Sequence, residues 1–373
     1  MSNSHSLNVL TYQTGWIANG LTWSARQGDP FRFAVGSFLQ EYKNHIDIVQ
    51  KNEAEELVCR ATWEHCYPPT KIMFSPSKAS HLPDLIITTA DYLRLWEVVR
   101  GAPADQPPVQ EKDLPENSEA PAEETKQDNL PEVDSKIIKK KQWSVDSHVV
   151  SKKVFDFGRP NDFCSPVTSC DWNVDDPKTV GCCSIDTTVT IWDIEAGKST
   201  TQLIAHDKDV YDIAFAKGTH TFASCGADGS VRIFDLREME HCTIVYETQR
   251  LAPLLRVAWN KLDSTYLSTF GVNGTEVIVI DIRYPSAPVA TLKDGHTGAI
   301  NSIGWAPHSA THMCSAGEDC TAVIWSLADL PNAQPTSFLN YAAQMPINSI
   351  SWSPVPNEWI GITSGKTAQI LKV

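Results

Sequence analysis

A pattern that repeats about every 45 residues is the feature that most constrains the fold of this 373-residue chain. Seven times, a short alternating run ends in a bulky apolar residue, and successive copies lie 47, 96, 42, 46, 45 and 46 residues apart. The seven residues are Val49, Trp96, Trp192, Phe234, Ile280, Trp325 and Leu371. Repeats of this length indicate units that cannot bury their apolar faces alone and must stack on their neighbours.

A second set of markers gives the same count. Each copy is preceded, 19 to 26 residues upstream, by a strand-like run that ends in an aromatic residue. These residues are Trp23, Phe74, Trp172, Phe215, Trp259, Trp305 and Trp352. A period of about 40–45 residues with this pattern is typical of WD repeats, in which each unit is a four-stranded antiparallel blade. We therefore predict an all-β fold, a seven-bladed WD-repeat β-propeller.

The ends of the chain predict how the ring closes. After the last marker too few residues remain before Val373 to form the outer strand of the seventh blade. The strand-like segment Leu7–Thr11 precedes the first counted strand, and we expect it to supply that outer strand. Closure matters because an open ring would leave two sheet edges exposed.

The step of 96 residues indicates an insertion in blade two. The gap from Trp96 to Trp172 is 76 residues, whereas the corresponding gaps elsewhere are 23 to 27. Residues 101–146 contain six prolines, many acidic residues and few aromatic ones, so they bury too little apolar surface to fold. We predict a disordered, acidic, Pro-rich insertion at 101–146 after the third strand of blade two. The propeller then comprises residues 1–100 and 147–373, with Val149–Phe157 as the missing outer strand.

Composition argues against several classes of function. The net charge is −14, of which residues 101–134 contribute −8, and an acidic surface disfavours nucleic-acid binding. The ten cysteines form no zinc-ligand pattern, and Cys170, Cys225 and Cys314 are expected to be buried free thiols in a reducing compartment. No apolar run approaches the roughly 20 residues of a membrane span. We expect neither a cofactor nor a metal. We also expect the protein to be located in cytoplasm and nucleus. The tract Lys136–Lys141 is either a nuclear-import signal or a solvated charge run.

Two sets of polar residues invite a catalytic interpretation. One set comprises His206, Ser224 and Asp228, and the other comprises His296, Ser315, Asp319 and Trp325. A His–Ser–Asp combination is typical of nucleophilic hydrolases. In WD repeats, however, the His precedes the first strand and the Asp lies in the turn between the second and third strands, so the set ties loop to turn. Because the arrangement occurs twice, we interpret both sets as structural.

The phosphate-binding and hydrolase motifs are missing or incomplete. The string Gly361–Thr367 places three residues between its glycines where a P-loop needs four, and no GxSxG or HExxH occurs. We therefore predict that the chain is not an enzyme. Its binding loops should lie on the narrow face of the ring; we expect them at Phe163–Val167, His206–Val210 and Gly295–Ala299, and at the turns of Asp91, Asp186, Asp228 and Asp319.

Two strings in consecutive blades place an arginine three residues after the third-strand marker. They are Phe234–Asp235–Leu236–Arg237 and Ile280–Asp281–Ile282–Arg283. One interpretation is a paired docking box for the adaptor of a cullin-RING ubiquitin ligase, because the planar guanidinium makes bidentate, partly desolvated contacts. The other is a salt bridge at the edge of each blade.

The strings PDLIITTADYLRLW, DFCSPVTSCDWN, CSIDTTVTIWDIEAGK and FASCGADGSVRIFDLR go beyond generic WD repeats. They resemble the Transparent Testa Glabra family of plant anthocyanin regulators, whose animal members are cullin-ligase-associated factors and scaffolds for DYRK-type kinases. The resemblance covers nearly the whole chain except residues 101–146. It implies a non-catalytic scaffold, monomeric within larger complexes, that assembles kinases or transcription factors. It also implies service as a ubiquitin-ligase substrate receptor, with Arg237 and Arg283 at the docking positions.

Overall fold

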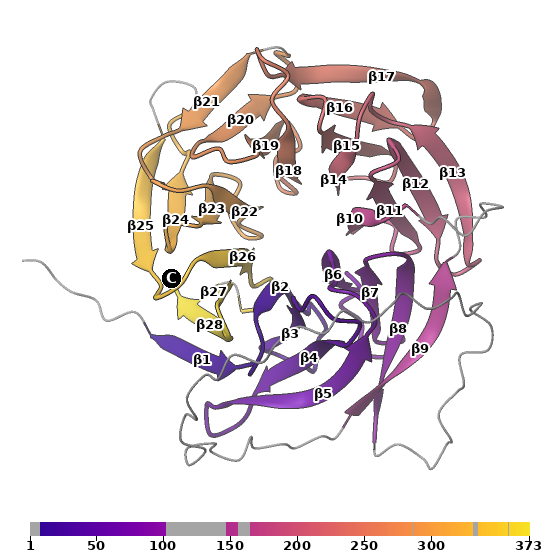
Figure 1. Ribbon diagram of the computed structural model, residues 1–373, viewed down its shortest axis with the longest axis vertical. Coiled ribbons are helices and arrows are strands. Elements are labelled where there is room, and N and C mark those ends of the chain that lie inside the picture. The colour runs from indigo at the N-terminus through magenta and orange to yellow at the C-terminus, as the bar shows by residue number, and fades with distance from the viewer. Residues whose placement is uncertain (1–7, 102–146, 156–164, 286, 331–334, 357) are drawn as a thin grey trace, which may run out of the picture.

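The chain folds into a closed ring of seven four-stranded antiparallel sheets (Figure 1). This computed structural model describes residues 8–101, 147–155, 165–285, 287–330, 335–356 and 358–373. Within these ranges all regular structure is β-strand, 28 strands in total, and no helix occurs. The predicted seven-bladed all-β propeller is confirmed.

Blades one to four use consecutive strands of the chain, which run from the ring centre to its rim in the order A, B, C, D. They comprise β2–β5 (Ala18–Trp23, Arg32–Ser37, Asn44–Lys51, Leu57–His65), β6–β9 (Lys71–Phe74, Leu85–Thr89, Leu93–Arg100, Ser147–Phe155), β10–β13 (Val167–Trp172, Thr179–Ser184, Thr188–Asp193, Lys198–Ile204) and β14–β17 (Val210–Phe215, Thr221–Gly226, Ser230–Asp235, Glu238–Glu247).

Blades five and six follow the same order, and blade seven takes its outer strand from the start of the chain. They comprise β18–β21 (Leu254–Trp259, Tyr266–Gly271, Val277–Asp281, Pro288–Leu292), β22–β25 (Ile300–Trp305, His312–Gly317, Thr321–Ser326, Thr336–Ala342), and β26–β28 (Ile347–Trp352, Trp359–Ser364, Thr367–Lys372) with β1 (Val9–Gln13). Each of the seven predicted aromatic markers is the last residue of an A strand.

Antiparallel alternation within a blade gives the ring two distinct faces. One face carries the D–A loops between blades, the starts of the A strands and the B–C turns. We call it the D–A face. The A–B and C–D turns lie at the opposite face, which we call the C–D face. This alternation decides which of the candidate residues can share a surface.

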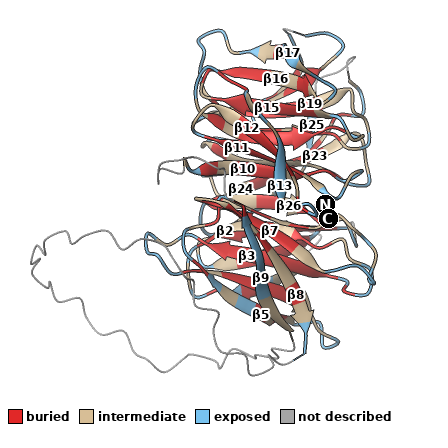
Figure 2. Cartoon of the chain, turned by 90° about the vertical axis from the view of Figure 1, so that its right-hand side faces the viewer, coloured by how far each residue is buried: buried red, intermediate tan, exposed pale blue. Residues whose placement is uncertain are grey.

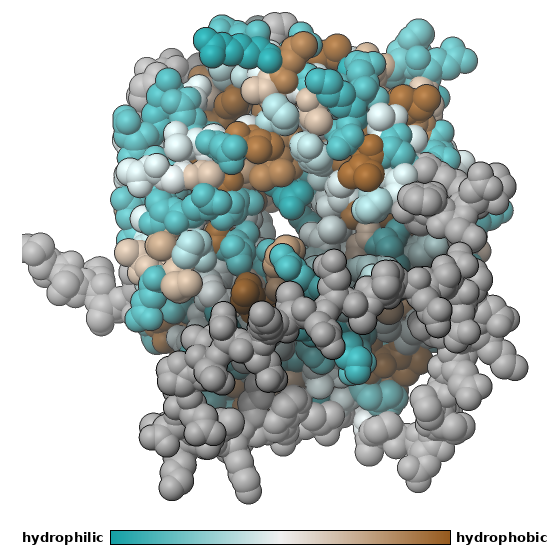
Figure 3. All heavy atoms as spheres, in the orientation of Figure 1, coloured by the Kyte–Doolittle hydropathy of each residue, from teal (hydrophilic) through white to brown (hydrophobic). Residues whose placement is uncertain are grey.

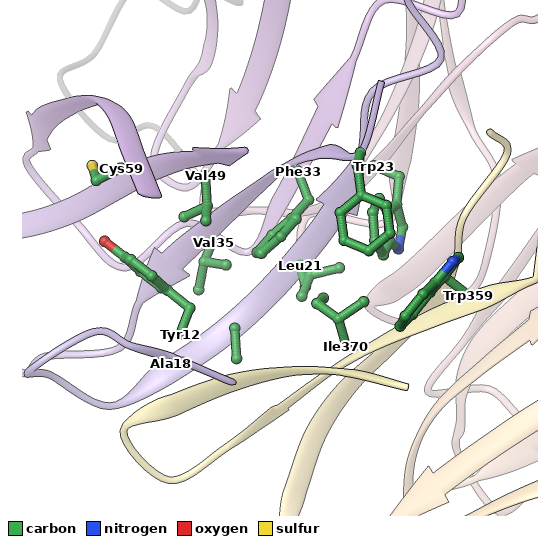
Figure 4. Packing of buried hydrophobic residues seen from close by; sticks show 12 residues of the cluster. Tyr12, Ala18, Leu21, Trp23, Phe33, Val35, Val49, Cys59, Trp359 and Ile370 are labelled. Carbon is green, nitrogen blue, oxygen red and sulfur yellow. The ribbon is translucent and has the colours of Figure 1, made fainter. Parts of the chain in front are cut away.

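The ring closes through β1, which pairs with β28 in the register Val9 to Leu371 and Gln13 to Thr367. The predicted closing strand is confirmed, although it lies two residues further along the chain than the expected Leu7–Thr11. The shift has a packing reason, because Tyr12 is 5% exposed and lies in the core between blades seven and one (Figure 4).

The insertion enters at the predicted place in blade two. Strand β8 ends at Arg100 and its partner β9 begins at Ser147, so β9 starts two residues earlier than the expected Val149. Residues 102–146, for which we predicted disorder, and residues 156–157 of the expected strand lie outside the described residues.

The core is divided among the interfaces between blades. The described residues form seven apolar clusters, and each one combines side chains of two neighbouring blades. Figure 2 shows this burial running through the sheets, with exposed residues on loops and on outer strands such as β13. Because every blade is one wall of two clusters, no blade has a core of its own.

Polar side chains link the inner strands around the central opening that Figure 3 shows. The Thr70 hydroxyl donates to the carbonyl of Val167 at 2.8 Å, and the Thr168 hydroxyl donates to that of Val210 at 2.6 Å. Two asparagines do the same in blades six and seven: the Asn301 amide donates to the carbonyl of Ile347, and that of Asn348 to the carbonyl of Ala18, both at 2.9 Å. These bonds satisfy backbone acceptors that no sheet ladder reaches.

Candidate functional site

The first His–Ser–Asp set lies at the D–A face of blade four. His206 precedes β14 and donates through Nδ1 to the Asp228 carboxylate at 2.9 and 3.0 Å, while its Nε2 accepts the Ser224 hydroxyl at 2.7 Å. Burial alone would raise the pKa of the Asp228 carboxyl, but hydrogen bonds from His206 and Ser230 outweigh it and hold that pKa well below its usual range. The carboxylate is therefore charged and fully engaged in tying loop to turn.

Blade six repeats the arrangement and completes it with tryptophan. His296 donates through Nδ1 to the Asp319 carboxylate at 3.1 and 3.2 Å, and its Nε2 accepts the Ser315 hydroxyl at 2.7 Å. The indole N–H of Trp325 donates to the Ser315 Oγ at 2.8 Å. In blade four Phe234 stands at the position of this tryptophan.

These contacts match the connectivity of a Ser–His–Asp triad, but a nucleophile must also reach its substrate. Ser224 and Ser315 are both 0% exposed, and their histidines are 1% and 6% exposed. Ser315 also accepts the Trp325 N–H, so its hydroxyl is held from both sides. Neither serine is accessible for attack, which agrees with a structural role.

A third set joins the end of β5 in blade one to blade two and was missed in the sequence. His65 donates through Nδ1 to the carbonyl of Tyr67 at 2.6 Å, and its Nε2 accepts the Thr88 hydroxyl at 3.0 Å. The Trp96 indole N–H donates to the same hydroxyl oxygen at 2.8 Å. Burial lowers the pKa of the His65 imidazole to about 4. Threonine in place of serine, and a longer spacing from the histidine, hid this set.

The prediction for Asp319 follows from its four acceptor contacts. Asp319→Ala removes the acceptor of the His296 imidazole, of the Thr297 and Thr321 amides and of the Thr321 hydroxyl, and it leaves the buried imidazole without its carboxylate. We expect the free energy of unfolding to fall by about 1–3 kcal/mol, measured by chemical denaturation. Asp329→Ala, at an exposed position of the same blade, should change it by less than about 0.5 kcal/mol. Equal effects of the two substitutions would refute the structural role.

The paired arginines lie at the other face of the ring, just after the C strands of blades four and five. Arg237 bonds the Asp235 carboxylate through Nε at 2.9 Å and Nη2 at 2.5 Å, and Arg283 bonds Asp281 in the same way at 2.9 and 2.6 Å. These hydrogen bonds lower the pKa of the Asp235 carboxyl to about 2 and also lower that of Asp281.

Each pair presents a pre-oriented guanidinium to solvent. The side chains of Arg237 and Arg283 are 68% and 56% exposed, whereas that of Asp281 is only 5% exposed. The aspartates therefore fix each fork, and the remaining N–H donors face outward. The salt bridge and the docking box are compatible interpretations. The salt bridge to aspartate fixes the orientation of the guanidinium that docking would use.

The predicted binding loops lie at the D–A face, opposite the arginines. These include His206–Val210, Gly295–Ala299 and the turns of Asp91, Asp186, Asp228 and Asp319; in the segment Phe163–Val167 the first two residues lie outside the described residues. A partner at these loops would leave the C–D face accessible.

Among the described residues, no group of three or more His, Cys, Asp or Glu side chains could hold a metal ion. Nor does that part of the chain contain a helix long and apolar enough to cross a membrane. Cys170, Cys225 and Cys314 are buried free thiols, and burial raises the pKa of the Cys314 thiol to about 12.

Comparison with known proteins places these features in context. The model of the WD domain, G-beta repeat, matches residues 159–193, 197–235 and 286–326. A DDB1- and CUL4-associated factor 7 homolog of Dictyostelium discoideum is 45% identical over 368 residues, covering 98% of each chain. An uncharacterized WD repeat-containing protein of Schizosaccharomyces pombe is 30% identical, covering 97% of this chain and 89% of its own. A WD repeat-containing protein of Saccharomyces cerevisiae is 28% identical, covering 100% and 78%.

Proposed function

This chain belongs to the WD-repeat family that includes the Dictyostelium factor 7 homolog, and we propose on that premise that it is a non-catalytic scaffold for regulatory proteins. The observation that carries the proposal is the rigid ring with two separate faces. One face carries the D–A loops, and the other carries two fixed arginines in adjacent blades. A scaffold needs such independent surfaces so that two partners can bind at once.

The partners in this proposal are proteins. The resemblance to the Transparent Testa Glabra family favours regulatory kinases and transcription factors, and we propose that they bind at the D–A face. We also propose that the chain works in cytoplasm and nucleus, which the buried free thiols support because a reducing compartment preserves them. Membership of the Transparent Testa Glabra branch is part of this proposal.

A second function, substrate receptor of a cullin-RING ubiquitin ligase, rests on Arg237 and Arg283. The name of the Dictyostelium relative associates that protein with DDB1 and CUL4. We propose that both guanidiniums here enter the adaptor and donate to its carboxylates or carbonyls through the N–H groups not used by Asp235 and Asp281. A substrate held at the D–A face would then be carried to the ligase.

The test is quantitative affinity purification from native cells, combined with a binding assay using purified adaptor. The Arg237→Ala, Arg283→Ala double variant should weaken adaptor binding at least about 30-fold, since truncating one arginine hot spot costs about 2 kcal/mol or more. Arg250→Ala is the matched control, because Arg250 is an exposed arginine of the same chain region at the opposite, D–A face. It should leave adaptor binding unchanged.

Three outcomes distinguish the two proposed functions. Loss of the adaptor with retention of kinases or transcription regulators in the double variant supports the receptor function and the two-face scaffold together. If those regulators co-purify equally with both proteins and no adaptor appears, the receptor function is rejected and the scaffold remains. If no regulatory protein co-purifies with the wild-type chain, the scaffold proposal itself fails.

A further inference from the structure

The turn after the C strand of blade five exposes an aromatic ring beside one of the paired arginines. Tyr284 follows Arg283 in the turn between β20 and β21, at the C–D face, and it is 72% exposed. The central carbon of the Arg283 guanidinium lies 5.8 Å from the centre of the Tyr284 ring. A cation and an aromatic face within this distance attract each other, so blade five presents the two side chains as one unit.

Backbone hydrogen bonds and core packing hold this turn in one shape. The Tyr284 N–H donates to the Asp281 carbonyl at 3.0 Å, and the Ile282 N–H donates to the Thr265 carbonyl at 3.0 Å. The Ile282 side chain packs against the apolar cluster between blades four and five. A partner that binds here meets a surface that is already ordered, so little conformational entropy is lost on binding.

Further apolar surface belongs to the same end of blade five. The hydrogen bond from Ile282 to Thr265 joins the C–D turn to the A–B turn, which carries Leu262, a side chain that is 47% exposed. Pro285, directly after the tyrosine, is exposed as well. Tyrosine and arginine are the residue types that contribute most to binding at the centres of protein interfaces, where apolar neighbours exclude water.

Blade four presents its arginine in different surroundings. Arg237 is followed at once by β17, whose first and third residues, Glu238 and Glu240, are both exposed. The side chain of its partner Asp235 is 34% exposed, whereas that of the counterpart in blade five, Asp281, is 5% exposed. Water therefore competes more strongly for the ion pair of blade four, and the two glutamates disfavour the approach of a partner's carboxylate.

On the premise of the receptor function proposed above, we propose that Tyr284 is a third contact residue for the adaptor and that blade five supplies most of the affinity. The adaptor surface that fits is an apolar pocket for the ring, bordered by carboxylate or carbonyl oxygens. These oxygens accept the N–H donors of Arg283 that Asp281 does not use. Arg237 then lies at the margin of the contact, where a charge affects the rate of association more than the affinity.

The experiment measures, by surface plasmon resonance, the affinity of single variants of the full chain for purified DDB1, a protein in the name of the Dictyostelium relative. Tyr284→Ala and Arg283→Ala should each weaken binding about 30-fold, and Arg237→Ala less than about fivefold. Tyr284→Phe keeps the ring and should bind like wild type. Equal losses for Tyr284→Phe and Tyr284→Ala would refute the ring as the contact. Melting temperatures show whether each variant is folded.

Tyr42→Ala is the matched control, because Tyr42 is a tyrosine of similar exposure, 77%, in the B–C turn of blade one at the opposite face. It should leave binding unchanged. If Tyr284→Ala binds as tightly as Tyr42→Ala while Arg283→Ala is weakened, the tyrosine contact is refuted and the receptor function stands. Equal losses for Arg237→Ala and Arg283→Ala refute the larger share of blade five. If wild type does not bind DDB1, the receptor function fails, and the tyrosine contact fails with it.

Discussion

Deleting residues 2–13 is expected to lower the free energy of unfolding by at least about 3–5 kcal/mol, the typical cost of emptying one large aromatic core site. The deletion removes β1 and with it Tyr12, which lies beside Val35 and Val49 in the cluster at the interface of blades seven and one (Figure 4). It also removes the donor of the 2.7 Å hydrogen bond from the Tyr12 hydroxyl to buried Asp47. The lost strand pairing adds to this cost.

The loss should extend beyond one blade. Without β1, strand β28 becomes an unpaired sheet edge, and the cluster that joins blades seven and one opens to solvent. Because the blades share their cores, weakening one interface lowers the stability of the closed ring as a whole. We therefore expect a lower denaturation midpoint together with concentration-dependent association through the exposed edge.

Deletion of residues 2–7 is the matched control, because it shortens the same end of the chain and keeps β1 intact. Chemical denaturation of the two truncated proteins beside wild type measures the effect. The shorter deletion should leave the unfolding curve in place. Superimposable curves for all three proteins would show that β1 is not required for closure.

Much of this architecture could be predicted because it repeats along the chain. The A-strand markers such as Trp172 and the C-strand markers such as Trp192 recur at regular intervals along the chain, so counting them gives the number of blades. Motif strength varies, however. The WD model matches residues around Trp192, Phe234 and Trp325, whereas blades with Val49 or Leu371 at this place keep the strand and lose the signature.

The features that escaped prediction depend on contacts between blades. Nothing in the segment around Thr70 or Asn301 indicates that each side chain bonds the next inner strand, because that neighbour is 46 or more residues away. A cavity that Arg32 of blade one and Arg100 of blade two line escaped prediction for the same reason, because its walls come from two neighbouring blades. Such sites become visible only when the ring is closed and the side chains are placed.

The set of side chains around His65 escaped prediction for a different reason. Its chemistry matches that of His296, but threonine replaces serine and the aspartate of the turn, Asp91, bonds Arg94 at 2.5 and 3.0 Å. His65 instead donates to a backbone carbonyl. A search for the same residue types at the same spacing cannot find a set whose partners have been exchanged.

The contacts of His65 predict that the free energy of unfolding falls at low pH. Protonating the buried His65 would place an N–H opposite the Thr88 hydroxyl, whose oxygen already accepts the Trp96 indole, and burial disfavours the cation; the folded-state pKa is about 4. In the unfolded chain the imidazole has its ordinary pKa near 6.5. The unfolded state therefore binds the proton first as pH falls.

The lower pKa of His65 in the folded state sets the direction of the pH effect. Stability contributed by neutral His65 is complete above pH 6.5 and is lost as pH falls from 6.5 toward 4, because protonation pulls the equilibrium toward the unfolded chain. From 1.36 kcal/mol per pKa unit, the loss is roughly 2 kcal/mol at pH 5. The carboxyls of Asp228 and Asp319, whose pKa values are lowered, lose their contribution only below about pH 4, so the two effects occupy different pH ranges.

Chemical denaturation at pH 7, 6 and 5 measures this loss, and His65→Gln isolates it, because an amide can still donate and accept but does not titrate. The variant should be less stable than wild type at pH 7 and should lose roughly 2 kcal/mol less between pH 7 and 5. His220→Gln removes an exposed imidazole and should lose stability with pH as wild type does. Parallel pH profiles for wild type and His65→Gln would mean that His65 has the same pKa in the folded and the unfolded chain, in conflict with the burial and the contacts that surround it.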